Sequence, residues 1–206
     1  MDDQFYLQDS RSNTGDGLMF WAQGGGYCTD LGRAEIFTKD RAIRYHEDRE
    51  SDVPWPKAYI DERSHTGVDC QYVSKEEAAT HLVEGCQCVA QIPGEWNGND
   101  LIWAKWPIGG SPNLDRAHRM DLAYTRSLEP TEVVIWPLSY IEGKARRLVH
   151  AGKVSINEAL IGTGIKLIKP KKPREQVFNC SGCGRFITDI QRYQEDCRNC
   201  GASNCP

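Results

Sequence analysis

The chain contains the stretch Trp-Pro-Lys-Ala-Tyr-Ile at residues 55–60 and a closely similar stretch, Trp-Pro-Leu-Ser-Tyr-Ile, at residues 136–141. With the same offset of 81 residues, the pattern Val-Ser-x-x-Glu-Ala at 73–78 recurs at 154–159. A repeat with this spacing indicates that one structural unit occurs twice. Upstream, with small gaps, Leu18–Ala22 aligns with Asp100–Ala104 and pairs Trp21 with Trp103.

The repeat predicts the domain organisation. Short runs of aromatic and β-branched residues are separated by glycine-rich turns and followed by capped helix signals, which is typical of α+β structure. We expect two tandem copies of a small antiparallel-sheet-plus-helix module, followed by a zinc ribbon. The expected boundaries are 1–85 for the first copy, 86–164 for the second, 165–175 for a basic connector and 176–206 for the ribbon.

Local signals within the copies predict individual elements. Thr38 is expected to cap a helix over 39–50, and Ser74 with Glu77 forms a capping box for a helix that reaches Val83. Residues 59–60 and 71–73 are expected to be strands, and 143–151 to be a basic helix without a counterpart in the first copy.

The positions shared by the two copies are packing and turn residues. The histidines do not recur: each histidine of one copy aligns with another residue type in the other copy. This pattern indicates a conserved scaffold and no duplicated active site. His46, His65, His81 and His150 are examples of these unmatched histidines.

The composition is that of an ordinary globular protein. The 206 residues are 39% hydrophobic and 26% charged, close to typical values. No window approaches 18 consecutive apolar residues, so no transmembrane helix is expected. The acidic start Met1–Phe5 does not resemble a signal peptide. We therefore expect a cytoplasmic protein that does not contact a membrane.

Four of the nine cysteines form the most specific motif. The C-terminal part contains a Cys-x-x-Cys-Gly pair at Cys180 and Cys183 and a second pair at Cys197 and Cys200. Two such pairs separated by a short hairpin are typical of a four-cysteine zinc site, and glycine after each second cysteine permits the positive φ of the turn. We expect one structural zinc ion, because four protein ligands leave no open position.

The remaining cysteines carry weaker signals. Cys205 is either a free thiol or a replacement for Cys200 as a ligand. Cys86 and Cys88 are either buried free thiols or, with His81, part of a second metal site. The residues alone leave these alternatives open.

Charge is distributed unevenly along the chain. The net charge is −11 over residues 1–143, +8 over 144–174 and −1 over 175–206, which gives the chain its −4. An acidic surface repels phosphate, so nucleic acid, the alternative partner, is expected to contact only the basic segment. The candidate residues there are Lys144, Arg146, Arg147, Lys169, Lys171, Lys172 and Arg174.

The sequence shows no motif of a common enzyme class. It contains no P-loop, no dinucleotide-binding glycine motif after a strand, no HExxH and no GxSxG. We therefore expect a non-enzymatic protein without a small-molecule cofactor. Acidic modules suit a basic protein surface, and aromatic residues beside turns are candidate interface anchors, namely Tyr27, Trp96 and Trp106.

The N-terminal third carries a resemblance. The pattern Tyr6-x-Gln8-Asp9-x-Arg11, followed by Phe20-Trp21-Ala22 and by Val53–Asp61, resembles small, mostly uncharacterised accessory proteins of tailed bacteriophages and prophages. The resemblance covers residues 5–73. It implies a phage-encoded protein that acts in the bacterial cytoplasm on a host protein of regulation or anti-phage defence, and it supplies no reaction or ligand.

Overall fold

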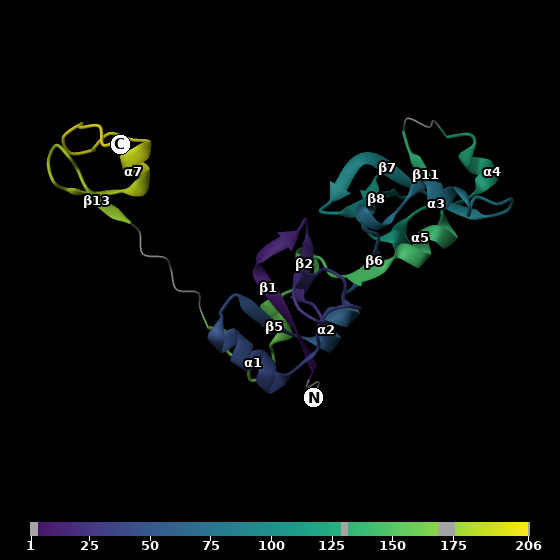
Figure 1. Cartoon of the computed structure of the whole chain (residues 1–206), viewed down its shortest axis with the longest axis horizontal. Coiled ribbons are helices and arrows are strands. Elements are labelled where there is room, and N and C mark those ends of the chain that lie inside the picture. The colour runs from purple at the N-terminus through teal and green to yellow at the C-terminus, as the bar shows by residue number, and fades with distance from the viewer. Residues whose placement is uncertain (1–3, 129–131, 169–175, 206) are drawn as a thin grey trace. The chain divides into compact units, whose positions relative to one another are not determined.

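The computed structural model describes residues 4–128, 132–168 and 176–205. The chain divides into two compact units, Met1–Ile168 and Lys169–Pro206. The protein is mixed α and β with antiparallel sheets, as expected (Figure 1). Among the helices of the described residues, none has both the length and the apolar character needed to cross a bilayer.

The larger unit contains two five-stranded antiparallel sheets with the same pattern of neighbours. The first has the order β3-β2-β1-β4, with β5 also paired to β1, and the second has the order β10-β7-β8-β9, with β11 paired to β7. Their strands are β1 (Gln4–Thr14), β2 (Gly17–Trp21), β3 (Tyr27–Cys28), β4 (Phe37–Thr38), β5 (Asp52–Pro56), β7 (Gln87–Asn97), β8 (Asp100–Ala104), β9 (Gly110–Ser111), β10 (Arg119–Asp121) and β11 (Val134–Pro137).

The long first strand of each sheet has the same irregularity. In β1 the register with β2 shifts between Gln8 and Asn13, and in β7 the register with β8 shifts between Gln91 and Trp96. Before each shift, a glutamine pairs with a fully buried aromatic residue: Gln8 with Phe20 and Gln91 with Trp103.

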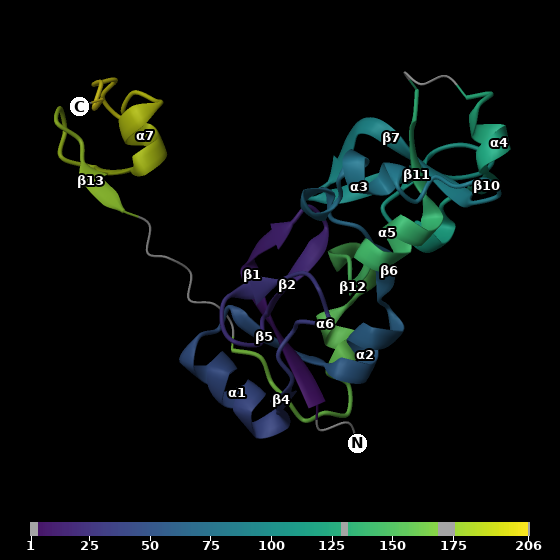
Figure 2. The same ribbon diagram turned by 45° about the vertical axis from the view of Figure 1, so that its right-hand side comes forward.

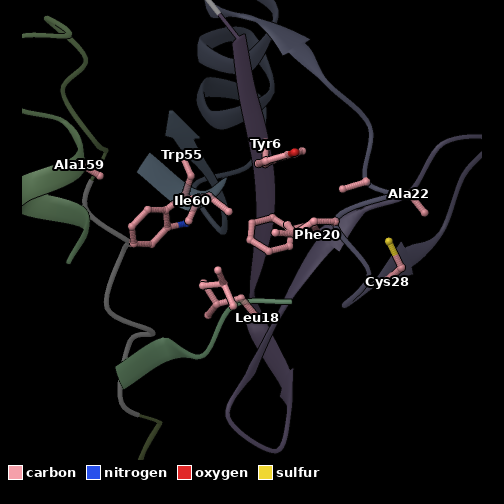
Figure 3. Close-up of a cluster of buried hydrophobic side chains, with 11 residues drawn as sticks. Tyr6, Leu18, Phe20, Ala22, Cys28, Trp55, Ile60 and Ala159 are labelled. Atoms are coloured by element: carbon pink, nitrogen blue, oxygen red, sulfur yellow. The ribbon is translucent and has the colours of Figure 1, made fainter. Parts of the chain in front are cut away.

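The alignment of Trp21 with Trp103 is therefore wrong by one residue. Phe20 occupies the place that corresponds to Trp103, and Trp21 is only half-buried. The side-chain period of a strand is two, so a shift of one residue moves a side chain to the opposite face. Phe20 packs in the core of the first sheet, where Tyr6 and Trp55 also lie (Figure 3).

The Trp-Pro stretches join a strand to a helix in each half. Trp55 and Trp136 are buried, and their indole N–H groups donate to Gln8 and Gln91 at 2.7 and 2.8 Å. Pro56 and Pro137 then precede α2 (Lys57–Glu62) and α5 (Leu138–Lys144).

The strand expected at residues 59–60 is wrong, because these residues lie in α2. β-Branched and aromatic residues favour strands only weakly, and tertiary packing overrides that preference. As parts of helices α2 and α5, Ile60 and its counterpart Ile141 are both completely buried.

The predicted helix cap at Thr38 is confirmed, because its hydroxyl accepts from the N–H of Arg41 at 3.4 Å at the start of α1 (Lys39–Asp48). The cap at Ser74 is also confirmed, but α3 (Lys75–Ala79) ends before Val83. The strand expected at 71–73 is instead the 3-10 turn η1 (Cys70–Tyr72). The remaining short elements are η2 (Leu114–Arg116), α4 (Leu122–Thr125), η3 (Ala151–Lys153) and α6 (Ile156–Ala159).

The expected basic helix at 143–151 is wrong. Residues 146–148 form the strand β12 (Arg146–Leu148), which pairs antiparallel with β6 (His65–Gly67) (Figure 2). The two strands are 81 residues apart in the sequence, and Arg147 lies opposite Thr66, its own counterpart under that offset.

Beyond β6 and β12, each half of the chain contributes its last segment to the core of the other half. The core of the first sheet includes Val149 and also Ala159, which Figure 3 shows. The core of the second sheet includes Val68 and Ala78. The backbone follows the same scheme, since the N–H of Leu18 donates to Val149 and that of Leu101 to Val68. Both hydrophobic cores therefore draw on both halves of the sequence.

Candidate metal centre

The C-terminal unit is small and depends on few apolar side chains. It contains β13 (Val177–Asn179), β14 (Phe186–Thr188) and α7 (Asp189–Tyr193), and Thr188 with Gln191 forms a complete capping box at the start of α7. Its buried cluster consists of Ile187 and two cysteines, with Phe178 and Ala202 packed against them. Such a small core is not expected to hold a fold without a metal or disulfides.

Two turns bring the four predicted cysteines together. The sulfur atoms of Cys180, Cys183, Cys197 and Cys200 all lie within 4.8 Å of one another. The Sγ atoms of Cys180 and Cys200 are 3.6 Å apart, and those of Cys183 and Cys197 are 3.7 Å apart. Each of these short distances joins a thiol of the first turn to a thiol of the second, so the two turns face each other across the cysteine cluster.

The glycine after each second cysteine has the conformation that the motif predicts. Gly184 has φ 69° and Gly201 has φ 70°, in the left-handed region that favours glycine. Their N–H groups donate to the carbonyls of Cys180 and Cys197 at 2.8 and 2.7 Å and close the two turns.

Gly182 shows how closely the two turns pack. A Cβ atom at this position would lie 3.1 Å from the Sγ of Cys200 and 2.7 Å from the Cβ of Ala202. Any larger residue would therefore press on a thiol of the opposite pair.

Backbone N–H groups point at the sulfur of the first cysteine. The N–H of Gly182 donates to the Sγ of Cys180 at 3.4 Å. Burial raises the pKa of this thiol, but N–H donors from Cys183 and Gly182 and the neighbouring thiols outweigh that effect and lower it to about 6. A thiolate is the form that binds a metal, and four sulfur ligands in this arrangement fit a soft, tetrahedral ion.

The other cysteines do not join a metal-binding group. Within the described residues, Cys180, Cys183, Cys197 and Cys200 make up the one group of at least three His, Cys, Asp or Glu side chains whose ligand atoms lie close enough together to hold a metal ion. Cys86 and Cys88 lie with their sulfurs 3.8 Å apart, and burial raises the pKa of Cys88 to about 11. Cys205 is exposed.

The basic residues proposed for nucleic acid that lie within the described residues are all paired with carboxylates. Lys144 lies 3.1 Å from Glu77, and Arg147 lies 3.3 Å from Asp61. The other candidates of this set, Lys169, Lys171, Lys172 and Arg174, lie outside the described residues.

Arg146 departs most clearly from its expected role. Its side chain is 11% exposed and lies 2.8 Å from Asp100 and 3.6 Å from Asp69. These two carboxylates, which come from distant parts of the sequence, hold the guanidinium inside the protein. Arg146 is therefore a structural ion-pair partner and is not available to contact phosphate.

The three predicted interface aromatics are all exposed, but they do not lie together. Trp106 is 75% exposed in the turn between β8 and β9, whereas Trp96 is 51% exposed and pairs with Leu101 near the other end of β8. Tyr27 belongs to the first sheet, where its hydroxyl accepts from Arg49 at 3.0 Å.

Ile108, which is 85% exposed, lies in the same turn as Trp106. The sequence analysis did not predict Ile108 as an interface residue. Its position two residues after Trp106, in the same turn, would have indicated it.

Comparison of the chain with protein-family models, with curated proteins and with solved structures gave no match.

Proposed function

We propose that this protein is a zinc-containing, non-enzymatic accessory protein of a bacteriophage, and that it binds a host protein in the bacterial cytoplasm. The observation that carries the proposal is the turn at Trp106 and Ile108, where two large apolar side chains are 75% and 85% exposed. Large apolar side chains that gather on a surface mark interaction sites, and tryptophan is enriched among the residues that dominate binding energy.

The charge of the larger unit favours a protein partner over nucleic acid. Residues 1–168 carry 18 Lys and Arg against 25 Asp and Glu. Three of the basic residues proposed for nucleic acid, Lys144, Arg146 and Arg147, are already paired with carboxylates. An acidic unit attracts a basic protein surface and repels the phosphate backbone of nucleic acid.

Zinc is the metal that we propose for the four-cysteine cluster. Four thiolates in two Cys-x-x-Cys-Gly turns are the donor set of structural zinc sites. With four protein ligands the ion has no position for a substrate, so its role is to hold Cys180, Cys183, Cys197 and Cys200 together and thereby fold the C-terminal unit.

We further propose that the two halves of the larger unit are copies of one module that have exchanged their last segments. The recurring sequence at 55–60 and 136–141, the shared strand neighbours and the matching register shifts in β1 and β7 support this origin. Under this proposal, the boundary at residue 85 separates the two repeats in the sequence. It does not separate two cores, because each hydrophobic core contains residues of both repeats.

Affinity capture tests the proposed partner. The full-length protein is immobilised and exposed to nuclease-treated bacterial lysate, alongside the double variant Trp106→Ala, Ile108→Ala and the matched control Ile161→Ala, which removes an apolar side chain that is 79% exposed elsewhere. We expect a bacterial protein to be retained by the wild type and the control and lost by the double variant. Equal retention by all three proteins contradicts the proposed surface, and no retained protein contradicts the proposed function.

A further inference from the structure

A cleft in the larger unit has a basic lining drawn from both halves of the sequence. Its volume is about 400 Å³, within the range of pockets that hold small molecules. The residues that its chemistry depends on are Arg63, His65, Ser111, Arg116, His150 and Lys153, and none of the described residues that line it is acidic. Arg116 and Lys153 are exposed, and neither forms an ion pair within the part of the chain that the structure describes.

Two histidines form one wall of the cleft. The rings of His65 and His150 pack edge to face with centroids 4.1 Å apart. The Nε2 atoms of both rings are buried and have no hydrogen-bond partner among the described residues. Buried polar atoms are almost always paired because an unpaired one destabilises the fold, so this wall of the cleft is unusual.

A second cleft lies at the positions of the fold that correspond to the first cleft, and the two clefts differ in charge. Under the offset of 81 residues, His65 corresponds to Arg146 and His150 to Asp69, and this second cleft is lined by Asp30, Asp69 and Arg146. Its central groups neutralise each other, since Arg146 lies 3.6 Å from Asp69. In the first cleft the pair of imidazoles stands in place of that ion pair, and Arg116 and Lys153 beside it have no carboxylate partner among the described residues.

The donors in the cleft suit an oxyanion with several acceptor oxygens. Arg116 offers a guanidinium fork and Lys153 an ammonium, both of which bind phosphate. The hydroxyl of Ser111 accepts from the N–H of Asn113 at 3.1 Å, which leaves its own proton to donate. Arg63 contributes less, because it is paired with Glu62 and stacked 3.7 Å over Tyr59.

We propose that this cleft binds the phosphate group of a small phosphomonoester, with Arg116 and Lys153 supplying the charge and the rings of His65 and His150 forming the wall beside it. The cationic lining opposes a metal ion at the histidine pair. The inference does not depend on the protein partner proposed above.

Charged groups in the lining and beside it act on the histidines in opposite directions. Burial and the neighbouring His150 lower the pKa of His65 to about 4, whereas Asp115 raises it and Lys153 and Arg116 lower it. Burial lowers the pKa of His150, Asp16 raises it, and Lys153 lowers it. A bound dianion stabilises the protonated rings and is expected to raise both pKa values.

Isothermal titration at constant ionic strength tests the proposal with three probes: inorganic phosphate, adenosine 5′-monophosphate and a single-stranded oligonucleotide without a terminal phosphate. We expect the first two to bind. The double variant Arg116→Ala, Lys153→Ala is expected to weaken this binding by at least about tenfold. The matched control Arg33→Ala, Lys144→Ala removes two cations from the second cleft and is expected to leave the affinity unchanged.

Three outcomes overturn the proposal: no binding of phosphate or the nucleotide, equal weakening by both double variants, or binding of the oligonucleotide alone, which would assign the contact to nucleic acid. Proton NMR of the wild type provides a readout that does not require a variant to fold. Phosphate is expected to shift the ring resonances of His65 and His150 and to leave that of the exposed His81 in place, and unshifted His65 and His150 resonances contradict the site.

Discussion

The hydroxyl of Tyr59 accepts a hydrogen bond from the backbone N–H of Ser155 at 2.9 Å, across 96 residues of sequence. The same hydroxyl donates to Glu158 at 3.1 Å. In the other half, Tyr140 accepts from the N–H of Ser74 at 2.7 Å and donates to Glu77 at 3.0 Å. Each tyrosine therefore anchors the first turn of a helix that belongs, by sequence, to the opposite half.

Removal of either tyrosine hydroxyl should weaken the packing of the last segment of one half against the sheet of the other half. Tyr59→Phe leaves the part-buried N–H of Ser155 without its acceptor, and we expect a loss of about 1 kcal/mol in the free energy of unfolding. Tyr140→Phe should lose a similar amount through Ser74. Urea denaturation measures both, with Tyr124→Phe as the control, because that side chain is 53% exposed. A loss no larger than that of the control would show that these hydrogen bonds do not stabilise the contact between the two halves.

Arg146 should be among the least replaceable charged residues. Arg146→Ala leaves Asp69 and Asp100, both nearly buried, without a countercharge, and we expect a loss of about 3–5 kcal/mol in the free energy of unfolding.

Arg147→Ala is the matched control, because its ion pair with Asp61 involves a side chain that is 50% exposed. Such pairs contribute at most about 1 kcal/mol. Partial rescue of Arg146→Ala by Asp100→Asn would identify the unpaired charge as the cause, whereas equal losses for the two arginine variants would contradict the structural role of Arg146.

Metal removal should unfold the C-terminal unit selectively. Under the proposal that zinc holds Cys180, Cys183, Cys197 and Cys200, a chelator or the change Cys180→Ser should abolish the protected amides of residues 176–205. Residues 4–128 should keep their hydrogen-exchange protection, because their cores contain none of these cysteines. Cys205→Ser serves as the control and should retain one equivalent of metal by elemental analysis. A folded C-terminal unit in metal-free, reduced protein would contradict this prediction.

The stability of the larger unit should depend on pH through His65. Its pKa is about 4 in the folded protein against 6.5 for an ordinary histidine. The unfolded chain therefore binds more protons between these values, so the contribution is fully present above pH 6.5 and is lost as the pH falls toward 4.

Urea titrations across that pH range compare the wild type with His65→Gln, and the exposed His81 provides the control His81→Gln. The slope of stability against pH should be smaller in His65→Gln than in the other two proteins. Identical slopes in all three would contradict the lowered pKa of His65.

Local signals in the sequence predicted those parts of the protein that depend on neighbouring residues. Thr38 and Ser74 were identified as helix caps because a cap is formed within three residues of the chain. The two Cys-x-x-Cys-Gly turns were identified for the same reason, since the spacing and the glycine determine the turn. The strand expected at Tyr59 and Ile60 was wrong because a two-residue strand signal is weaker than packing.

The sequence by itself determined that a Trp-Pro-x-x-Tyr-Ile element occurs twice and that four thiols are spaced for one site, because both properties are patterns of residues along the chain. Only the tertiary structure decided that Val149 packs in the core of the first sheet and Val68 in that of the second, that Arg146 is held between Asp69 and Asp100, and that His65 meets His150. Each of these contacts joins residues more than 30 positions apart, and no periodicity or local propensity specifies such a pairing. Burial of apolar surface selects these pairings once both halves of the chain are folded.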